Sequence, residues 1–214
     1  MIENSQMIYI IMSLTVGYLL GSISPSFLIG KWKGYDVREQ GTGNAGASNT
    51  VIMAGNFAGA VVAIVDVLKS AVASLLCKAL FPFFLAGVLG GIAAILGHMF
   101  PIFLGFRGGK GLACIAGVIL ACEPMALIPL FILSMLICFL LKSPSLVAPV
   151  ISIVWPLYHG HSTGLWMEAA ILAIPILPIF IKHMPNFRRI AEGEDLPMRF
   201  LWNKDEEIRR LQKK

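Results

Sequence analysis

The chain has 214 residues, of which 57% are hydrophobic and only 14% are charged. Soluble domains hold about 45–50% apolar and about 25% charged residues, so this composition excludes a soluble globular protein and makes lipid part of the solvent. The formal net charge is +5, but the basic residues are spread over short loops between apolar segments, so we expect no nucleic-acid partner.

Long apolar segments follow one another along the chain with helical periodicity. They cover residues 7–30, 54–80, 83–103, 111–122, 124–141, 146–158 and 164–181. A membrane-spanning helix needs roughly 20 apolar residues, and the fourth and sixth segments are short, which leaves the count open by one. We predict an all-α, polytopic membrane helix bundle of about seven transmembrane spans. It forms a single integral-membrane domain over residues 1–214, with a tail over 183–214.

The distribution of lysine and arginine predicts the orientation. Basic residues follow the first, third, fifth and seventh segments, whereas the alternate loops hold few of them. Loops rich in lysine and arginine remain on the cytoplasmic side. We therefore expect the N-terminus outside and the C-terminus and its tail in the cytoplasm.

The first basic loop contains the sequence REQGTGNAGASN, residues 38–49. Its glycines match the dinucleotide-binding pattern GxGxxG, but no strand precedes them and no ribose-binding acid follows at the required distance. Hydroxyl and amide side chains between the glycines suit a backbone that wraps an anion or a polyol. A flexible loop is the alternative.

The second basic loop contains GHMFPIFLGFRGGKG, residues 97–111. Glycines leave backbone amides uncovered, and amides beside Arg107 and Lys110 predict a cradle for a phosphate-like anion. The loop is not a Walker A motif, because Leu104 and Gly111 stand where that motif needs glycine and Ser or Thr. The alternative is a positively charged turn that anchors a helix.

Other polar groups stand out against the apolar background. Asp66 and Lys69 share one face of the second span, where charges are costly and usually face a partner, a cavity or each other. The four cysteines form no CxxC or Cys/His pattern in sequence, so we expect no metal site. A polar cluster after the last span exits on the same side as the two glycine-rich loops: His183, Asn186, Arg188, Arg189, Gly193 and Glu194.

Together, three motifs resemble the integral-membrane acyl-phosphate:glycerol-3-phosphate acyltransferases of bacteria, the PlsY type. They read REQGTGNAGASN, GHMFPIFLGFRGGKGLAC and HMPNFRRIAEGE, in the family's order and over nearly the whole chain. The resemblance implies seven spans in a bacterial cell membrane and a cytoplasmic active site. It also implies transfer of a fatty acyl group from acyl phosphate to the 1-hydroxyl of glycerol 3-phosphate, with membrane lipids around the protein and with neither cofactor nor metal.

The resemblance also implies the site residues. Catalytic roles fall to Lys110, Thr42, Asn186 and His183. Substrate binding falls to Arg38, Gly43, Asn44, Ser48, Asn49, Arg107, Gly108, Gly109, Gly111, Asp66, Lys69 and Glu194.

Two positions depart from the family pattern. Cys114 replaces a threonine, and Ile52 replaces an arginine that should help to hold a substrate phosphate. These departures leave a catalytically altered paralogue as one alternative. A transporter of organic phosphates that uses the same anion-binding loops is another, although the two halves of the chain show no inverted repeat.

Overall fold

The computed structural model describes residues 4–192, and within that range all regular structure is helical. In chain order the helices are α1 (Asn4–Ser22), α2 (Pro25–Trp32), α3 (Ala47–Ala54), α4 (Asn56–Leu80), α5 (Ala86–Met99), η1 (Ile102–Leu104), α6 (Leu112–Cys122), η2 (Pro124–Ala126), α7 (Leu127–Leu140), η3 (Pro144–Leu146), α8 (Val147–Thr163), α9 (Trp166–Leu172) and α10 (Ile176–Ala191).

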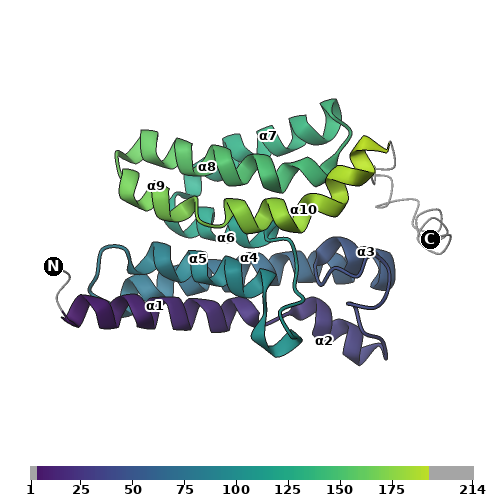
Figure 1. Cartoon of the computed structure of the whole chain (residues 1–214), viewed down its shortest axis with the longest axis horizontal. Helices are drawn as coiled ribbons and strands as arrows, with labels where there is room; N and C mark the ends of the chain where they lie inside the picture. The colour runs from purple at the N-terminus through teal and green to yellow at the C-terminus, as the bar shows by residue number, and fades with distance from the viewer. Residues whose placement is uncertain (1–3, 193–214) are drawn as a thin grey trace.

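The helices form two layers with α6 between them (Figure 1). In one layer α1 packs along α5, and α4 contacts α5 and α6; in the other α8 contacts α7, α9 and α10. The loop before α3, the loop before α6 and the end of α10 lie toward the end of the bundle opposite the N-terminus (Figure 1), which we call the loop end. The fold thus brings together segments from three distant parts of the sequence.

Four helical stretches are long and apolar enough to cross a membrane. They are Asn4–Trp32, Asn56–Leu80, Ala86–Leu104 and Trp166–Ala191, and Leu112–Cys122 and Pro124–Leu140 are shorter apolar helices. Large apolar side chains remain on the outside, as on α7, where Leu140 is 74% exposed. Since such a surface is stable in contact with acyl chains, these features confirm the predicted all-helical membrane bundle.

The first predicted apolar segment is broken rather than continuous. α1 ends at Ser22 and α2 begins at Pro25, with the Ser24 hydroxyl accepting a hydrogen bond from the Phe27 amide at 3.3 Å. Proline has no N–H with which to continue the helical ladder and is favoured in a first helical turn. The break leaves the carbonyl of Ile23 available to a partner from another helix.

The last segment also differs from its prediction. It consists of α9 and α10, separated by a turn at residues 173–175, and α10 continues to Ala191. Its final ten residues lie beyond the predicted end of the span at residue 181. The first part of the predicted tail is therefore a continuation of the last apolar helix, and it carries His183 and Asn186.

Small residues allow α1 and α5 to approach closely. A Cβ atom added at Gly17 would lie 2.1 Å from the carbonyl oxygen of Gly90, and one added at Gly21 would lie 2.1 Å from that of Ala94. Such contact between backbones supplies dispersion energy where lipid gives no hydrophobic drive for helix association. The contact fixes α5, and with it the start of the second glycine-rich loop.

We expect Gly21→Ala to destabilise the bundle by about 1–3 kcal/mol, since the added methyl group overpacks a backbone contact. Alanine favours helix by about 1 kcal/mol over glycine, so a net loss identifies the clash rather than a change in propensity. Thermal unfolding in detergent measures it. The control is Ala60→Val at an exposed position of α4, and equal melting temperatures for wild type and Gly21→Ala would contradict the prediction.

Candidate functional site

The first glycine-rich loop is built around the side chain of Asn49. Its Oδ1 accepts a hydrogen bond from the Thr42 amide at 2.8 Å, and its Nδ2 donates to the carbonyls of Val37 and Gln40 at 3.0 and 3.1 Å. Asn49 is fully buried. A Cβ atom at Gly41, where φ is +62°, would lie 2.2 Å from Asn49 Oδ1. The structure therefore places Asn49 inside the loop, where its side chain organises the loop backbone.

Arg38 also binds within the loops. Its Nε and Nη2 hydrogen-bond to the Asp36 carboxylate, with the shortest contact 2.6 Å, and its Nη1 donates to the Leu104 carbonyl at 2.9 Å. The guanidinium lies 5.2 Å from the centre of the Phe27 ring. Arg107 donates in turn to the Arg38 carbonyl at 3.2 Å. Arg38 thus joins the two loops.

The second loop turns back over the end of α5. The amides of Gly108 and Gly109 donate to the carbonyls of Met99 and His98 at 3.2 and 3.1 Å. The last carbonyls of a helix have no partner within the helix, so the returning chain satisfies them. The expectation that these two amides are uncovered is wrong. The glycines are required for space instead, because a Cβ at Gly109 would lie 2.1 Å from His98 Nε2.

The two loops meet, and each leads into a helix. A Cβ atom at Gly46 would lie 4.0 Å from the Gly109 Cα. Gly46 precedes α3 and Gly111 precedes α6, and neither helix start carries a side-chain cap. Among the described residues, the amides of the first three residues of each helix have no acceptor, whereas those of Thr50 and Ile115 donate to the carbonyls of Gly46 and Gly111. Free amides at a helix start bind anions.

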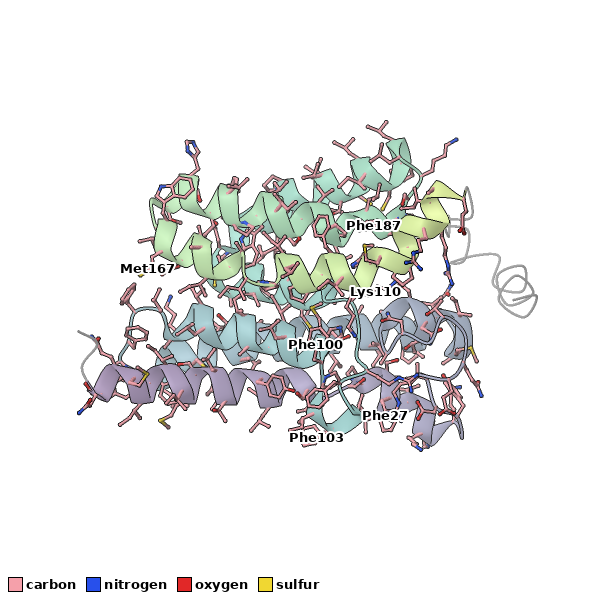
Figure 2. All side chains as sticks on the ribbon, in the orientation of Figure 1. Phe27, Phe100, Phe103, Lys110, Met167 and Phe187 are labelled. Carbon is pink, nitrogen blue, oxygen red and sulfur yellow. The ribbon has the colours of Figure 1, made fainter. Side chains whose placement is uncertain are left out.

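The end of α10 contributes the third part of the site. Lys110 Nζ donates to Asn186 Oδ1, and Asn186 Nδ2 donates to the Ser145 hydroxyl at 2.7 Å. Lys110 lies between the two layers (Figure 2). His183, one turn before Asn186, is buried, and its Nδ1 lies 2.8 Å from the Ile179 carbonyl. That carbonyl can only accept, so Nδ1 carries the proton and Nε2 of the neutral ring is an acceptor.

Asp66 and Lys69 lie beneath the second loop. Lys69 Nζ is 2.7 Å from Asp66 Oδ1, 3.1 Å from His98 Nδ1 and 2.6 Å from the Ile23 carbonyl at the break between α1 and α2. Both charges are almost fully buried. The Lys69 ammonium, which the sequence predicts to bind substrate, contacts three groups inside the bundle.

The other predicted residues lie at the loop end or outside the described range. Gly43 and Ser48 are exposed and Thr42 and Asn44 are half-buried, so the loop presents them toward its surface. Ile52 is 1% exposed on α3. Glu194 lies outside the described residues.

Sequence reasoning missed Ser145 and Lys182. Lys182 Nζ donates to the Gly108 carbonyl at 3.3 Å and lies 4.9 Å from the centre of the Phe100 ring. Its spacing of four residues from Asn186 was a usable signal, since such residues share a helix face. Ser145 lies in the short connection between α7 and α8, after Lys142 and Ser143, and offered no such signal.

Comparison with known proteins shows to which family the chain belongs. The family model for glycerol-3-phosphate acyltransferases matches residues 11–193. The chain is 37% identical over 195 residues to a glycerol-3-phosphate acyltransferase of Allorhizobium ampelinum, covering 87% of this chain and 90% of that protein. This chain belongs to the glycerol-3-phosphate acyltransferase family.

Other members of the acyltransferase family agree in sequence and in fold. The protein of that name from Listeria welshimeri is 36% identical over 197 residues, covering 87% of this chain and 95% of the relative. The crystal structure of PlsY (YgiH), an integral membrane glycerol 3-phosphate acyltransferase, in its glycerol 3-phosphate form has a TM-score of 0.78 at 30% identity, covering 90% of this chain and 96% of that one. Its lysophosphatidic acid form has a TM-score of 0.76 at 29% identity, covering 88% and 94%.

The ion pair of Asp36 and Arg38 predicts a definite pH dependence. Hydrogen bonding from Arg38 lowers the pKa of Asp36 from 3.8 to about 2. Because the pKa is lower in the folded state, the contribution of the pair is fully present above pH 3.8 and is lost as the pH falls through about 2.

Amide hydrogen exchange of residues 35–44, compared between wild type and Asp36→Asn at each pH, measures this contribution. We expect faster exchange in the variant above about pH 4 and convergence of the two proteins toward about pH 2. Equal exchange rates at neutral pH would show that the pair does not hold the loop.

Proposed function

We propose that this protein transfers a fatty acyl group from acyl phosphate to the 1-hydroxyl of glycerol 3-phosphate. The products are lysophosphatidic acid and phosphate, in the first acylation of phospholipid synthesis. The contact between Lys110 and Asn186 carries the proposal, because it joins the second loop to α10 at the place where the first loop also arrives.

Two phosphate groups must lie side by side for this reaction. The uncapped starts of α3 and α6 supply two sets of backbone amides, and Lys110 directly precedes the start of α6. Helix starts favour anions through their free N–H groups and their partial positive charge. We assign the phosphate groups of the two substrates to these helix starts, with Thr42, Asn44 and Ser48 completing the hydrogen bonds.

The chemistry needs positioning more than a strong protein base. The glycerol hydroxyl oxygen attacks the acyl carbonyl carbon, the bond from that carbon to the phosphate oxygen breaks, and the hydroxyl proton passes to a substrate phosphate oxygen. Lys110 stabilises the charge on the departing phosphate, and His183 Nε2 helps to position the acceptor by accepting a hydrogen bond from its 2-hydroxyl, which leaves the proton of the reacting hydroxyl to the substrate phosphate. Orientation and charge stabilisation of this kind account for large rate enhancements.

The arrangement in the membrane follows from the same site. We propose about seven spans, with the N-terminus outside and the loop end at the cytoplasmic face of a bacterial cell membrane. The positive-inside rule supports this orientation, since Lys31 and Lys33 lie at the end of α2 and Arg107 lies in the second loop, all toward the loop end. The acyl chain of the donor remains among membrane lipids while its phosphate reaches the loops.

Lys110→Ala should lower turnover about 100-fold or more, because removing one group that stabilises transition-state charge has an effect of that size. The assay follows phosphate release and lysophosphatidic acid formation from palmitoyl phosphate and glycerol 3-phosphate with purified protein. Lys33→Ala, which removes an exposed lysine from a connection at the same end, is the control and should retain wild-type turnover.

Unchanged turnover in Lys110→Ala would refute the assignment of the second loop. Binding of both substrates by wild type without any product would refute the acyltransferase reaction and favour phosphate transport instead.

Ile52→Arg tests the departure from the family pattern. Ile52 follows Ser48 by one turn of α3, so a long side chain there can extend its guanidinium toward the loop surface. We expect the KM for glycerol 3-phosphate to fall about tenfold. This change is smaller than the full gain in affinity from a close contact between an arginine and a phosphate group. Ile52→Met, which keeps the length without the charge, is the matched control. An unchanged KM in a folded Ile52→Arg protein would show that another cation has taken over this contact.

A further inference from the structure

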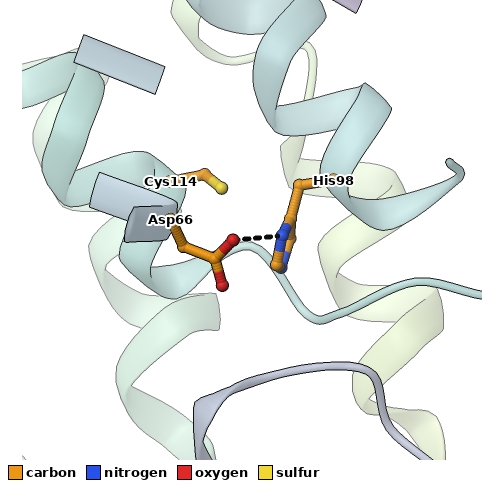
Figure 3. A group of neighbouring side chains, drawn as sticks. All are labelled: Asp66, His98 and Cys114. Carbon is orange, nitrogen blue, oxygen red and sulfur yellow. Dashed lines mark ion pairs between the residues drawn. The ribbon is translucent and has the colours of Figure 1, made fainter. Parts of the chain in front are cut away.

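Three side chains with metal-binding atoms gather in one buried place beneath the second loop. Asp66 comes from α4, His98 from the last turn of α5 and Cys114 from the first turn of α6. One carboxylate oxygen, one ring nitrogen and the thiol sulfur all lie within 4.8 Å of one another. Figure 3 shows the three side chains pointing toward one another. The proposed acyl transfer uses none of them directly.

We propose that Asp66, His98 and Cys114 form a binding site for a divalent cation of the zinc class. Carboxylate, imidazole and thiolate are all zinc ligands, and a thiolate disfavours magnesium and calcium. In a tetrahedral zinc site the ligand atoms lie about 3.4–3.6 Å apart. Asp66 Oδ1 and His98 Nδ1 are already 3.3 Å apart. Only the Cys114 sulfur has to approach, by a distance that side-chain rotation covers.

The same place already holds a positive charge. The Lys69 ammonium lies against Asp66, His98 and the Ile23 carbonyl, as described above. Despite its short distance to Lys69, Asp66 Oδ1 accepts no well-directed hydrogen bond, although it is buried. This oxygen therefore retains a lone pair for a cation inside the cluster. The cluster is electrostatically suited to a cation, and a metal ion would compete with the Lys69 ammonium for this position.

The charges balance when the metal binds. The Cys114 thiol releases its proton to water and forms the sulfur–metal bond, and Lys69 releases one proton to water because an ammonium beside the divalent ion is repelled. The Asp66 carboxylate and the Cys114 thiolate then neutralise the two charges of the metal. The site is neutral before and after binding, and the amine of Lys69 can still donate to the Ile23 carbonyl. Binding therefore leaves no unpaired charge in the bundle, which would be costly.

Occupancy would also affect the second loop. The His98 ring supports Gly109 from below, and Lys110 follows Gly109 directly. A metal bond to His98 would hold the ring and the loop in one position, so we expect zinc to inhibit turnover. This consequence rests on the proposed function, whereas metal binding itself does not.

The test is a titration of the purified full chain with Co²⁺ in detergent. Cobalt bound to a thiolate gives a charge-transfer band in the near ultraviolet, and we expect the band to saturate at a single ion per chain. Cys114→Thr and Cys114→Ser should both lose the band and bind cobalt at least tenfold more weakly. Cys122→Ser is the matched control, because Cys122 lies at the other end of α6 beside Ser74 and outside the cluster.

Thermal unfolding provides a second measurement that needs no substrate. Zn²⁺ should raise the melting temperature of the wild type and of Cys122→Ser, but not that of Asp66→Asn or Cys114→Ser. The absence of a charge-transfer band in wild type, or its persistence in the Cys114 variants, would overturn the proposal. An inactive chain that binds cobalt through Cys114 would support the site and refute only the proposed acyl transfer.

Discussion

The buried ammonium of Lys69 is the contact on which the loop end depends. It binds the carbonyl left open by the break between α1 and α2, the carboxylate of Asp66 on α4 and the imidazole of His98 on α5. A buried charge that loses its partner is strongly destabilising, so these three elements cannot separate without a large cost. The end of α5 is thereby fixed, and the second glycine-rich loop is built directly on that end through the carbonyls of His98 and Met99.

Most polar groups of the loops bind one another. Asn49 organises the first loop, Arg38 joins it to the second, and the glycine amides return to α5. These internal hydrogen bonds occupy groups that could otherwise bind a substrate, but they fix the geometry of the loops. A site that is already fixed loses less entropy when a ligand binds. In the proposed reaction a small set of groups is left to bind the substrates: two helix starts, the hydroxyls and amides on the surface of the first loop, and Lys110 with its partner on α10.

The architecture and the family could be read from the sequence because they depend on patterns along the chain. Apolar length predicted the long helices, although not α3, the break between α1 and α2 or the turn between α9 and α10. The three motifs predicted that their loops belong together. Individual roles were harder, since Arg38, Asn49 and Lys69 have the right chemistry for phosphate binding. Only the fold shows which groups these side chains contact. Arg38 contacts the Asp36 carboxylate, Asn49 contacts carbonyls of its own loop, and Lys69 contacts the carbonyl at the break between α1 and α2. The cluster of Asp66, His98 and Cys114 was invisible for the same reason: its members are 32 and 16 residues apart and meet only through the packing of α4, α5 and α6.

The continuity of α10 has a consequence for how the protein responds to its bilayer. The helix extends from Ile176 to Ala191 with Pro185 directly before Asn186, so Asn186 is joined to the lipid-facing turns through a helix that lacks one backbone hydrogen bond. A transmembrane helix adjusts its tilt when the hydrocarbon thickness around it changes. Because Asn186 lies about ten residues, or roughly 15 Å, from the start of α10, a small tilt displaces its amide relative to Lys110. We therefore expect membrane thickness to act on the geometry of the proposed reaction, so that the lipid such an enzyme helps to make is also part of its mechanical environment.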